Sequence, residues 1–207
     1  MPQIAHRGRW LWEDLDPKEA RAGAVLAALR MGVSREPGDV SVLWRHYRAV
    51  VPDEAAARGR IHPSLAAEHA ALTLFAVHQQ SQSSRMHREG SPLGASLRAL
   101  RASAFKDNPD ALDRRVNAAA ATESIKDLTV HLRGLVRLLR DQQIPLDYTA
   151  LVEDVAAWHY PDARGRVRRR WGAQYYVWSA PDADGAGDHG GAGAGAGPAS
   201  LPAQSAS

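Results

Sequence analysis

Residues 1–180 carry a series of helix-start signals and no clear β-strand pattern. Asp16-Pro17 and Asn108-Pro109 each place a capping residue before a first-turn proline, and Asp147 is a further cap. No segment alternates apolar and polar residues between hairpin turns. The pattern predicts helices over about 17–31, 40–50, 63–80, 92–102, from 109, and over 122–142, 147–160 and 162–176. Short connections between them predict an all-α fold, a compact multi-helix bundle of about eight helices.

The last part of the chain differs in composition. Residues 181–207 are mainly Gly, Ala, Ser and Pro, and Leu201 is their one large aliphatic residue. Such a segment cannot bury enough apolar surface to offset the entropy of ordering, so we expect it to be disordered. Its Gly-Ala run follows no strand and indicates low complexity, not a phosphate-binding loop. The predicted organisation is one helical domain, 1–180, and a disordered tail, 181–207.

The absence of cysteine excludes disulfides and thiolate metal sites. The N-terminal residues lack a signal-peptide pattern, and no apolar run approaches the ~18 residues of a transmembrane helix. We therefore expect a cytoplasmic protein without membrane contact.

Arginine dominates the positive charge. Of the 26 Lys and Arg residues, 23 are Arg, and the net charge is +3. Arginine matches phosphate geometry with a planar fork, although a GC-rich genome favours Arg, Ala and Gly whatever the function. The positions of the arginines therefore say more than their number.

The segment 122–142 separates its charges by face. At 100° per residue, one face carries Ile125, Leu128, Leu132, Leu135, Val136 and Leu139, and the flank beside that face carries four cations. We call this set the basic flank: Lys126, Arg133, Arg137 and Arg140. Cations spaced along one flank can follow a phosphate backbone. The alternatives are an ordinary solvated face and a simple ion pair between Arg137 and Asp141, four residues apart.

Other arginines cluster outside this segment. Arg85 and Arg88 lie in a polar stretch before Gly90. Arg114 and Arg115 lie in the first turns of a predicted helix, where positive charge opposes the helix dipole. Asp113 could offset that charge, which is the structural alternative to a binding role.

Patterns typical of catalysis and metal binding are missing from the sequence. It contains no His-Glu-x-x-His pair, no His-Asp dipeptide and no Gly-x-Ser-x-Gly elbow. We expect a protein that is not an enzyme and uses no metal or cofactor. His69 lies near an apolar helix face and is expected to be a buried, hydrogen-bonded imidazole. The tryptophans could stack on bases, but their helical spacing with Leu and Val favours core positions. Trp10 and Trp12 are expected to anchor the N-terminal segment, and the spacing of Trp171, Tyr175 and Trp178 is expected to pack the last helix against the bundle.

Several stretches, taken together, resemble a known family. Residues 76–100 include Ala-Val-His-Gln-Gln-Ser, Arg-Met-His-Arg and Ser-Pro-Leu-Gly-Ala-Ser-Leu. They are followed in order by the stretches 113–117, His131-Leu-Arg-Gly-Leu-Val-Arg-Leu-Leu139 with 144–148, and 164–172. In this order and spacing, over about residues 8–176, the chain resembles the CasB family, the small subunit of type I-E CRISPR Cascade complexes.

The resemblance implies a helical, non-catalytic subunit that acts in antiviral defence. Two copies are expected in the complex, bound to its backbone and large subunits. CRISPR RNA and target DNA are the expected nucleic-acid partners, at the guide–target hybrid and the displaced strand of the R-loop. Carried over by motif, the nucleic-acid-binding candidates are Arg85, Arg88, Arg114, Arg115, Arg133 and Arg137, followed by Arg45 and Arg164.

The role implied by the resemblance suits the chemistry of these residues. A displaced strand varies in sequence, so a protein that holds it should contact phosphates and not base edges. Two other functions remain open. One is a helical scaffold whose arginines pair with carboxylates of partner proteins. The other is a helical nucleic-acid hydrolase whose site is assembled from distant positions.

Overall fold

The computed structural model describes residues 4–177. In this range the all-α prediction is confirmed, because no β-strand forms and two isolated bridges join His6 to Ala49 and His87 to Leu146. The predicted tail, 181–207, lies outside the described residues. The helices are α1 (Leu11–Asp14), α2 (Ala22–Arg30), the 3-10 helix η1 (Ser41–His46), α3 (Asp53–Ala57), α4 (Pro63–His78), α5 (Leu93–Ser103), α6 (Pro109–Ala121), α7 (Ile125–Asp141), α8 (Tyr148–Trp158) and α9 (Pro161–Tyr176).

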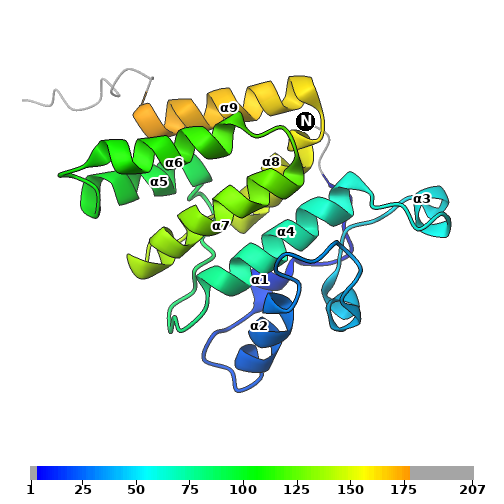
Figure 1. Ribbon diagram of the computed structural model, residues 1–207. Coiled ribbons are helices and arrows are strands. Elements are labelled where there is room, and N and C mark those ends of the chain that lie inside the picture. The colour runs from blue at the N-terminus through cyan, green and yellow to red at the C-terminus, as the bar shows by residue number, and fades with distance from the viewer. Residues whose placement is uncertain (1–3, 178–207) are drawn as a thin grey trace, which may run out of the picture.

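Helix α4 lies at the centre of the bundle and packs against α2, α7 and α8 (Figure 1). It begins where the sequence predicts, since Pro63 occupies the first helical position and the His62 ring accepts the Ser64 N–H at 3.3 Å. Every residue from Ala67 to His78 is buried. The sequence places apolar residues on almost all sides of this helix, as expected for a helix that is buried at the centre of a bundle.

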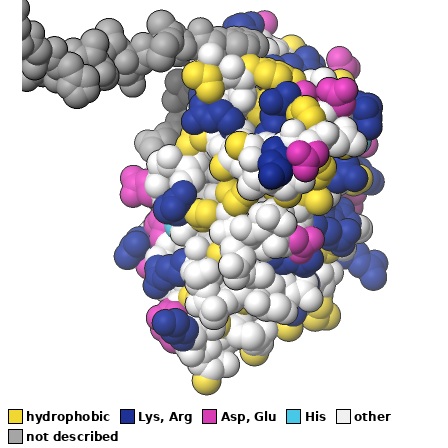
Figure 2. All heavy atoms as spheres, turned by 90° about the vertical axis from the view of Figure 1, so that its left-hand side faces the viewer, with side chains coloured by type: hydrophobic (Ala, Val, Ile, Leu, Met, Phe, Trp, Pro, Cys, Tyr) yellow, Lys and Arg dark blue, Asp and Glu magenta, His cyan; other side chains and the backbone are white. Residues whose placement is uncertain are grey.

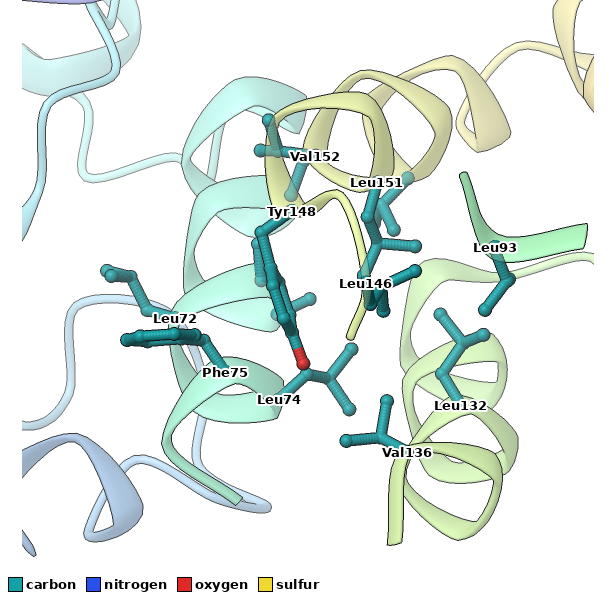
Figure 3. Packing of buried hydrophobic residues seen from close by; sticks show 14 of the residues in the cluster. Leu72, Leu74, Phe75, Leu93, Leu132, Val136, Leu146, Tyr148, Leu151 and Val152 are labelled. Atoms are coloured by element: carbon teal, nitrogen blue, oxygen red, sulfur yellow. The ribbon is translucent and has the colours of Figure 1, made fainter. Parts of the chain in front are cut away.

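Helix α7 covers α4 with a continuous apolar face. Ser124 caps it by accepting the Asp127 N–H at 3.0 Å, two residues after the helix start predicted at residue 122. Figure 3 shows Tyr148 beside Leu72 and Phe75 of α4, with Val136 of α7 on its other side. The Tyr148 and Phe75 rings meet edge to face, with 5.3 Å between their centroids. Burial of these faces holds α4, α7 and α8 together.

Helices α5, α6 and α9 lie together at one end of the molecule, the top in Figure 1. Helices α5 and α9 approach closely at Gly94, where an added Cβ would lie 2.6 Å from the Trp171 carbonyl oxygen. Trp171 stacks on Trp158 of α8 with 5.1 Å between ring centroids, and its indole N–H donates to Asp154 at 2.6 Å. Aromatic side chains therefore pack the last helix against the bundle, as expected for Trp171 and Tyr175. The third aromatic of that pattern, Trp178, lies outside the described residues.

The N-terminal third contains less α-helix than predicted. Residues 17–21 form turns before α2 begins, and the predicted helix 40–50 is the shorter 3-10 helix η1. Helices α1 and α3 are not predicted from the sequence, because helices of four and five residues are too short to show a periodic pattern.

Buried polar side chains of α4 determine the path of this irregular region. The carboxylate of Glu68 accepts the backbone N–H groups of Arg48 at 2.6 Å and Ala49 at 2.8 Å. The His69 ring bonds to the Tyr47 hydroxyl at 2.7 Å and to the Gly32 carbonyl at 3.0 Å, so the prediction of a buried, hydrogen-bonded imidazole is confirmed. These long-range bonds satisfy backbone groups that a helix would otherwise pair locally.

The tryptophans divide between core and surface. Trp10 and Trp12 are buried and stacked, as expected for anchors of the N-terminal segment. The core position expected for Trp44 is wrong, because its side chain is 62% exposed. The η1 segment turns Trp44 outward, where its indole N–H donates to the Gly38 carbonyl at 2.7 Å.

Candidate nucleic-acid interface

Ion pairs within the chain occupy the two ends of the basic flank on α7. Lys126 Nζ lies 3.3 Å from a Glu36 carboxylate oxygen, and Arg140 Nη2 lies 2.8 Å from Asp141 Oδ1. The alternative pair between Arg137 and Asp141 is not formed, since Asp141 binds Arg140. The flank therefore offers its central cations, and not all four, to a ligand.

Arg133 and Arg137 are these central cations. Arg133 is half-buried, and its Nη1 donates to the Ser34 hydroxyl at 3.0 Å. Arg137 is exposed and has no hydrogen-bond or ion-pair partner for its side chain within residues 4–177. Burial, followed by the nearby charge of Arg137, lowers the pKa of Arg133. Because no carboxylate of the described chain neutralises the two guanidinium groups, an anion would be stabilised here.

Helix α6 carries Arg114 and Arg115, which are both exposed and have no ion-pair partner in the described part of the chain. Asp113 does not offset them. Its carboxylate accepts Arg101 Nε at 2.9 Å and the Tyr175 hydroxyl at 2.6 Å. The Arg101 hydrogen bond, as the main cause, lowers the pKa of Asp113. Asp113 therefore joins α6 to α5 and α9, and the charges of Arg114 and Arg115 stay available.

Arg85 and Arg88 lie on the loop between α4 and α5. Arg85 Nη1 donates to the Glu13 carbonyl at 3.1 Å, and Arg88 Nε donates to the Ser91 hydroxyl at 2.8 Å. Both side chains are exposed and bond to neutral groups. These contacts hold the two guanidinium groups in place without neutralising them.

The two remaining candidates lie on other elements. Arg45 is exposed in η1, next to the exposed Trp44. Arg164 lies in the first turns of α9, and its Nη1 donates to the Glu123 carbonyl between α6 and α7. Arg168 reinforces the same junction, since its Nη2 donates to the Thr122 carbonyl at 2.7 Å. Sequence patterns gave no sign of this junction, because its partners are more than 40 residues apart.

The structure thus brings four of the eight candidates to one pair of helices. Helices α6 and α7 pack against each other and are joined by a short turn (Figure 1). We call the set Arg114, Arg115, Arg133 and Arg137 the α6–α7 cation group. Figure 2 shows Lys and Arg side chains along both edges of the view, on either side of a largely uncharged central area. Arg85 and Arg88 form a second group on their loop, and Arg45 and Arg164 belong to neither group.

A groove with a volume of about 560 Å³ lies between α4, the first half of α7 and residues 32–37, and Arg133 is the one member of the α6–α7 cation group that lines it. Its lining mixes apolar side chains, among them Val33, Ile125 and Val130, with charged ones that include Glu36, Lys126 and Arg133. Within residues 4–177, no group of three or more His, Asp or Glu side chains is placed to hold a metal ion. In the same range, no helix has the length and apolar character needed to span a membrane.

The fold and these side chains together define a class of protein, a helical bundle with exposed, unpaired arginines on its surface. Comparison with family models identifies the family within this class. The model of the CRISPR-associated protein Cse2 matches residues 25–176, so the chain belongs to the Cse2 family. The resemblance to CasB read from the sequence is thereby confirmed.

Solved structures agree with this assignment. CasB from Thermobifida fusca is 32% identical, with a TM-score of 0.60 over 76% of this chain and 86% of that one. A chain of a CRISPR RNA-guided surveillance complex is 26% identical, with a TM-score of 0.58 over 76% of this chain and 84% of that one. A Cse2-family protein from Thermus thermophilus, 20% identical, shares the fold with a TM-score of 0.57 over 80% of this chain and 94% of that one. A search of curated protein sequences gave no match.

Proposed function

We propose that the chain is a non-catalytic subunit of a CRISPR RNA-guided surveillance complex and binds nucleic-acid backbone without reading its sequence. In this role it stabilises the hybrid of guide RNA and target DNA and the displaced strand of the R-loop. The observation that carries the proposal is the α6–α7 cation group, four arginines without carboxylate partners in the described chain. Membership of the Cse2 family and the similarity to a chain of such a complex support it.

The chemistry of the α6–α7 cation group suits backbone binding. The two packed helices fix the backbone positions of these arginines, and the planar guanidinium fork matches the geometry of a phosphate. Contacts with phosphates carry no sequence information, which suits a strand whose sequence changes with every target. Release of counterions from the nucleic acid makes such binding strongly dependent on salt.

The proposal includes protein partners. As a subunit of such a complex, the chain binds other subunits and a second copy of itself, and it works in the cytoplasm. A purely structural role, as a scaffold without nucleic-acid contact, is the second candidate. It is favoured by large apolar side chains at the surface, since Trp44 is 62%, Val130 56% and Ile61 46% exposed. Exposed apolar side chains of this kind often mark contacts between proteins.

The decisive experiment removes charge from α6 in a reconstituted complex. Arg114→Ala with Arg115→Ala should shorten the R-loop lifetime on the order of tenfold, because two phosphate contacts are lost. Both side chains are exposed and unpaired, so thermal unfolding of the subunit should change little. The dependence of R-loop lifetime on salt should also become shallower, by about one to two counterions.

A matched control removes the same charge from another surface. Arg58 and Arg60 are exposed near α3, on the opposite side of the molecule from α6 in Figure 1. Arg58→Ala with Arg60→Ala should leave the R-loop lifetime unchanged. Equal lifetimes for the α6 variant, the control and the wild type would refute backbone binding by α6. A complex that loses the subunit but keeps its R-loop lifetime would favour the scaffold.

A further inference from the structure

The middle of α7 contains a glycine that the folded chain does not require. Glycine inside a helix is less stable than alanine, because it loses more backbone freedom on folding. At Gly94 a close helix crossing explains the glycine, and at Gly32 an added Cβ would lie 2.6 Å from Leu43 Cδ2. At Gly134, an added Cβ would meet no atom within 4 Å, and the residue is exposed. No contact within the described chain therefore accounts for a glycine at this position.

The two cations on the adjoining flank are also unfavourable for the isolated protein. Arg133 and Arg137 are four residues apart on one helix, where like charges repel. Asp141 is paired with Arg140 and Glu36 with Lys126, so neither carboxylate offsets them. Gly134, which has no side chain, and the two cations Arg133 and Arg137, which have no carboxylate partner in the described chain, thus lie close together on α7.

We propose that a nucleic-acid backbone crosses α7 at Gly134, with a phosphate bound by Arg137 and Arg133. The missing Cβ lets a bulky sugar-phosphate chain approach the helix backbone closely. The phosphate supplies the negative charge that the chain itself does not. This inference rests on the proposed function and assigns one of its contacts to a particular turn of α7.

The composition of this surface favours a polyanion over a protein helix. A protein helix packed at a glycine needs a surrounding apolar stripe, because apolar burial drives such contacts. Within α7, Val130 is the one large apolar residue that is exposed. The groove beside α7 has both apolar and charged lining residues, and Gly134 is not among them. Binding of a partner protein at this surface is the alternative that the test must distinguish.

The test is the variant Gly134→Ala, which separates fold stability from binding. Alanine should raise the Tm by about 1–4 °C, because it is the better helix former and its methyl group meets no atom. The same methyl group should hold the phosphate away from α7. We expect the affinity of the isolated subunit for a fluorescein-labelled 30-nucleotide single strand to fall about three- to tenfold. The R-loop lifetime in the reconstituted complex should shorten by a similar factor.

Gly23→Ala provides the matched control. Gly23 is also exposed and helical, in the first turn of α2, and an added Cβ there meets no atom within 4 Å. This variant should keep or slightly raise the Tm and bind the single strand like the wild type. If Gly134→Ala also binds like the wild type, or lowers the Tm, the inference is overturned. Loss of incorporation into the complex with unchanged binding would assign the surface to a protein and overturn it as well.

The arginine variants on α6 distinguish this failure from failure of the proposed function. If Arg114→Ala with Arg115→Ala shortens the R-loop lifetime while Gly134→Ala does not, only the contact on α7 is wrong. If neither variant has an effect, the proposed backbone binding fails together with the contact.

Discussion

The buried imidazole of His78 makes the stability of the fold depend on pH. The His78 side chain is fully buried at the end of α4. Its Nε2–H donates to the Ile144 carbonyl at 3.0 Å, and its Nδ1 accepts the Tyr148 hydroxyl at 3.1 Å. Burial is the main reason that the pKa of His78 is lowered from 6.5 to about 4. The folded protein therefore keeps this ring neutral at a pH at which the unfolded chain protonates it.

The sign and size of the effect follow from proton linkage. Because the pKa of His78 is lower in the folded state, its contribution to stability is fully present above pH 6.5 and is lost as the pH falls toward 4. Between pH 7 and pH 5, this one residue should cost about 2 kcal/mol of the free energy of unfolding. With a urea dependence of about 2 kcal/mol per molar, the unfolding midpoint should fall by about 1 M.

The assay compares wild type with His78→Gln in urea, with tryptophan fluorescence as the signal, at pH 7 and pH 5. Glutamine does not titrate and can still donate an amide N–H toward Ile144. His69, His87 and the carboxylates titrate in both proteins, so the difference between the two isolates His78. The wild-type midpoint should fall about 1 M further than that of the variant. An equal fall in the two proteins would refute the assignment of this pH dependence to His78.

Two further substitutions test the packing described above. Gly94→Ala places a methyl group 2.6 Å from the Trp171 carbonyl oxygen, so it should destabilise the fold by about 1–3 kcal/mol despite the helix propensity of alanine. A thermal unfolding Tm at or above that of wild type would contradict this reading of the α5–α9 crossing. Glu68→Ala leaves the N–H groups of Arg48 and Ala49 without their acceptor and should cost about 2–5 kcal/mol. In hydrogen exchange these two amides should lose protection, and unchanged protection would argue against the role given to Glu68.

The helices from α4 onward could be predicted from sequence because local signals define them. Pro63, Pro109 and Asp147 mark helix starts that the structure reproduces within a residue, and buried leucines define the inner face of α7. The N-terminal third could not be predicted in the same way. Its shape depends on Glu68 and His69, whose partners lie 19 to 37 residues away and leave no periodic pattern in the sequence.

The candidate site shows the same limit of sequence reasoning. The angular position of the basic flank on α7 could be calculated from helix geometry alone. Which of its cations stay unpaired could not be predicted from the sequence, because Lys126 binds a carboxylate 90 residues away and Arg133 binds a hydroxyl 99 residues away. The motif around Arg164 predicts a binding role, whereas its hydrogen bond to the Glu123 carbonyl joins α9 to the α6–α7 connection. The binding roles of all eight arginines remain predictions.

The central position of α4 has a consequence for the order in which the protein takes shape. Glu68 and His69 hold the segments around residues 32 and 47–49, which leave the ribosome before α4 itself. His78 holds Ile144 and Tyr148, which are synthesised much later. Because the early segments have few local contacts, they can settle only once α4 is present and packed against α7 and α8. The first part of the chain to be made is therefore among the last to reach its final form.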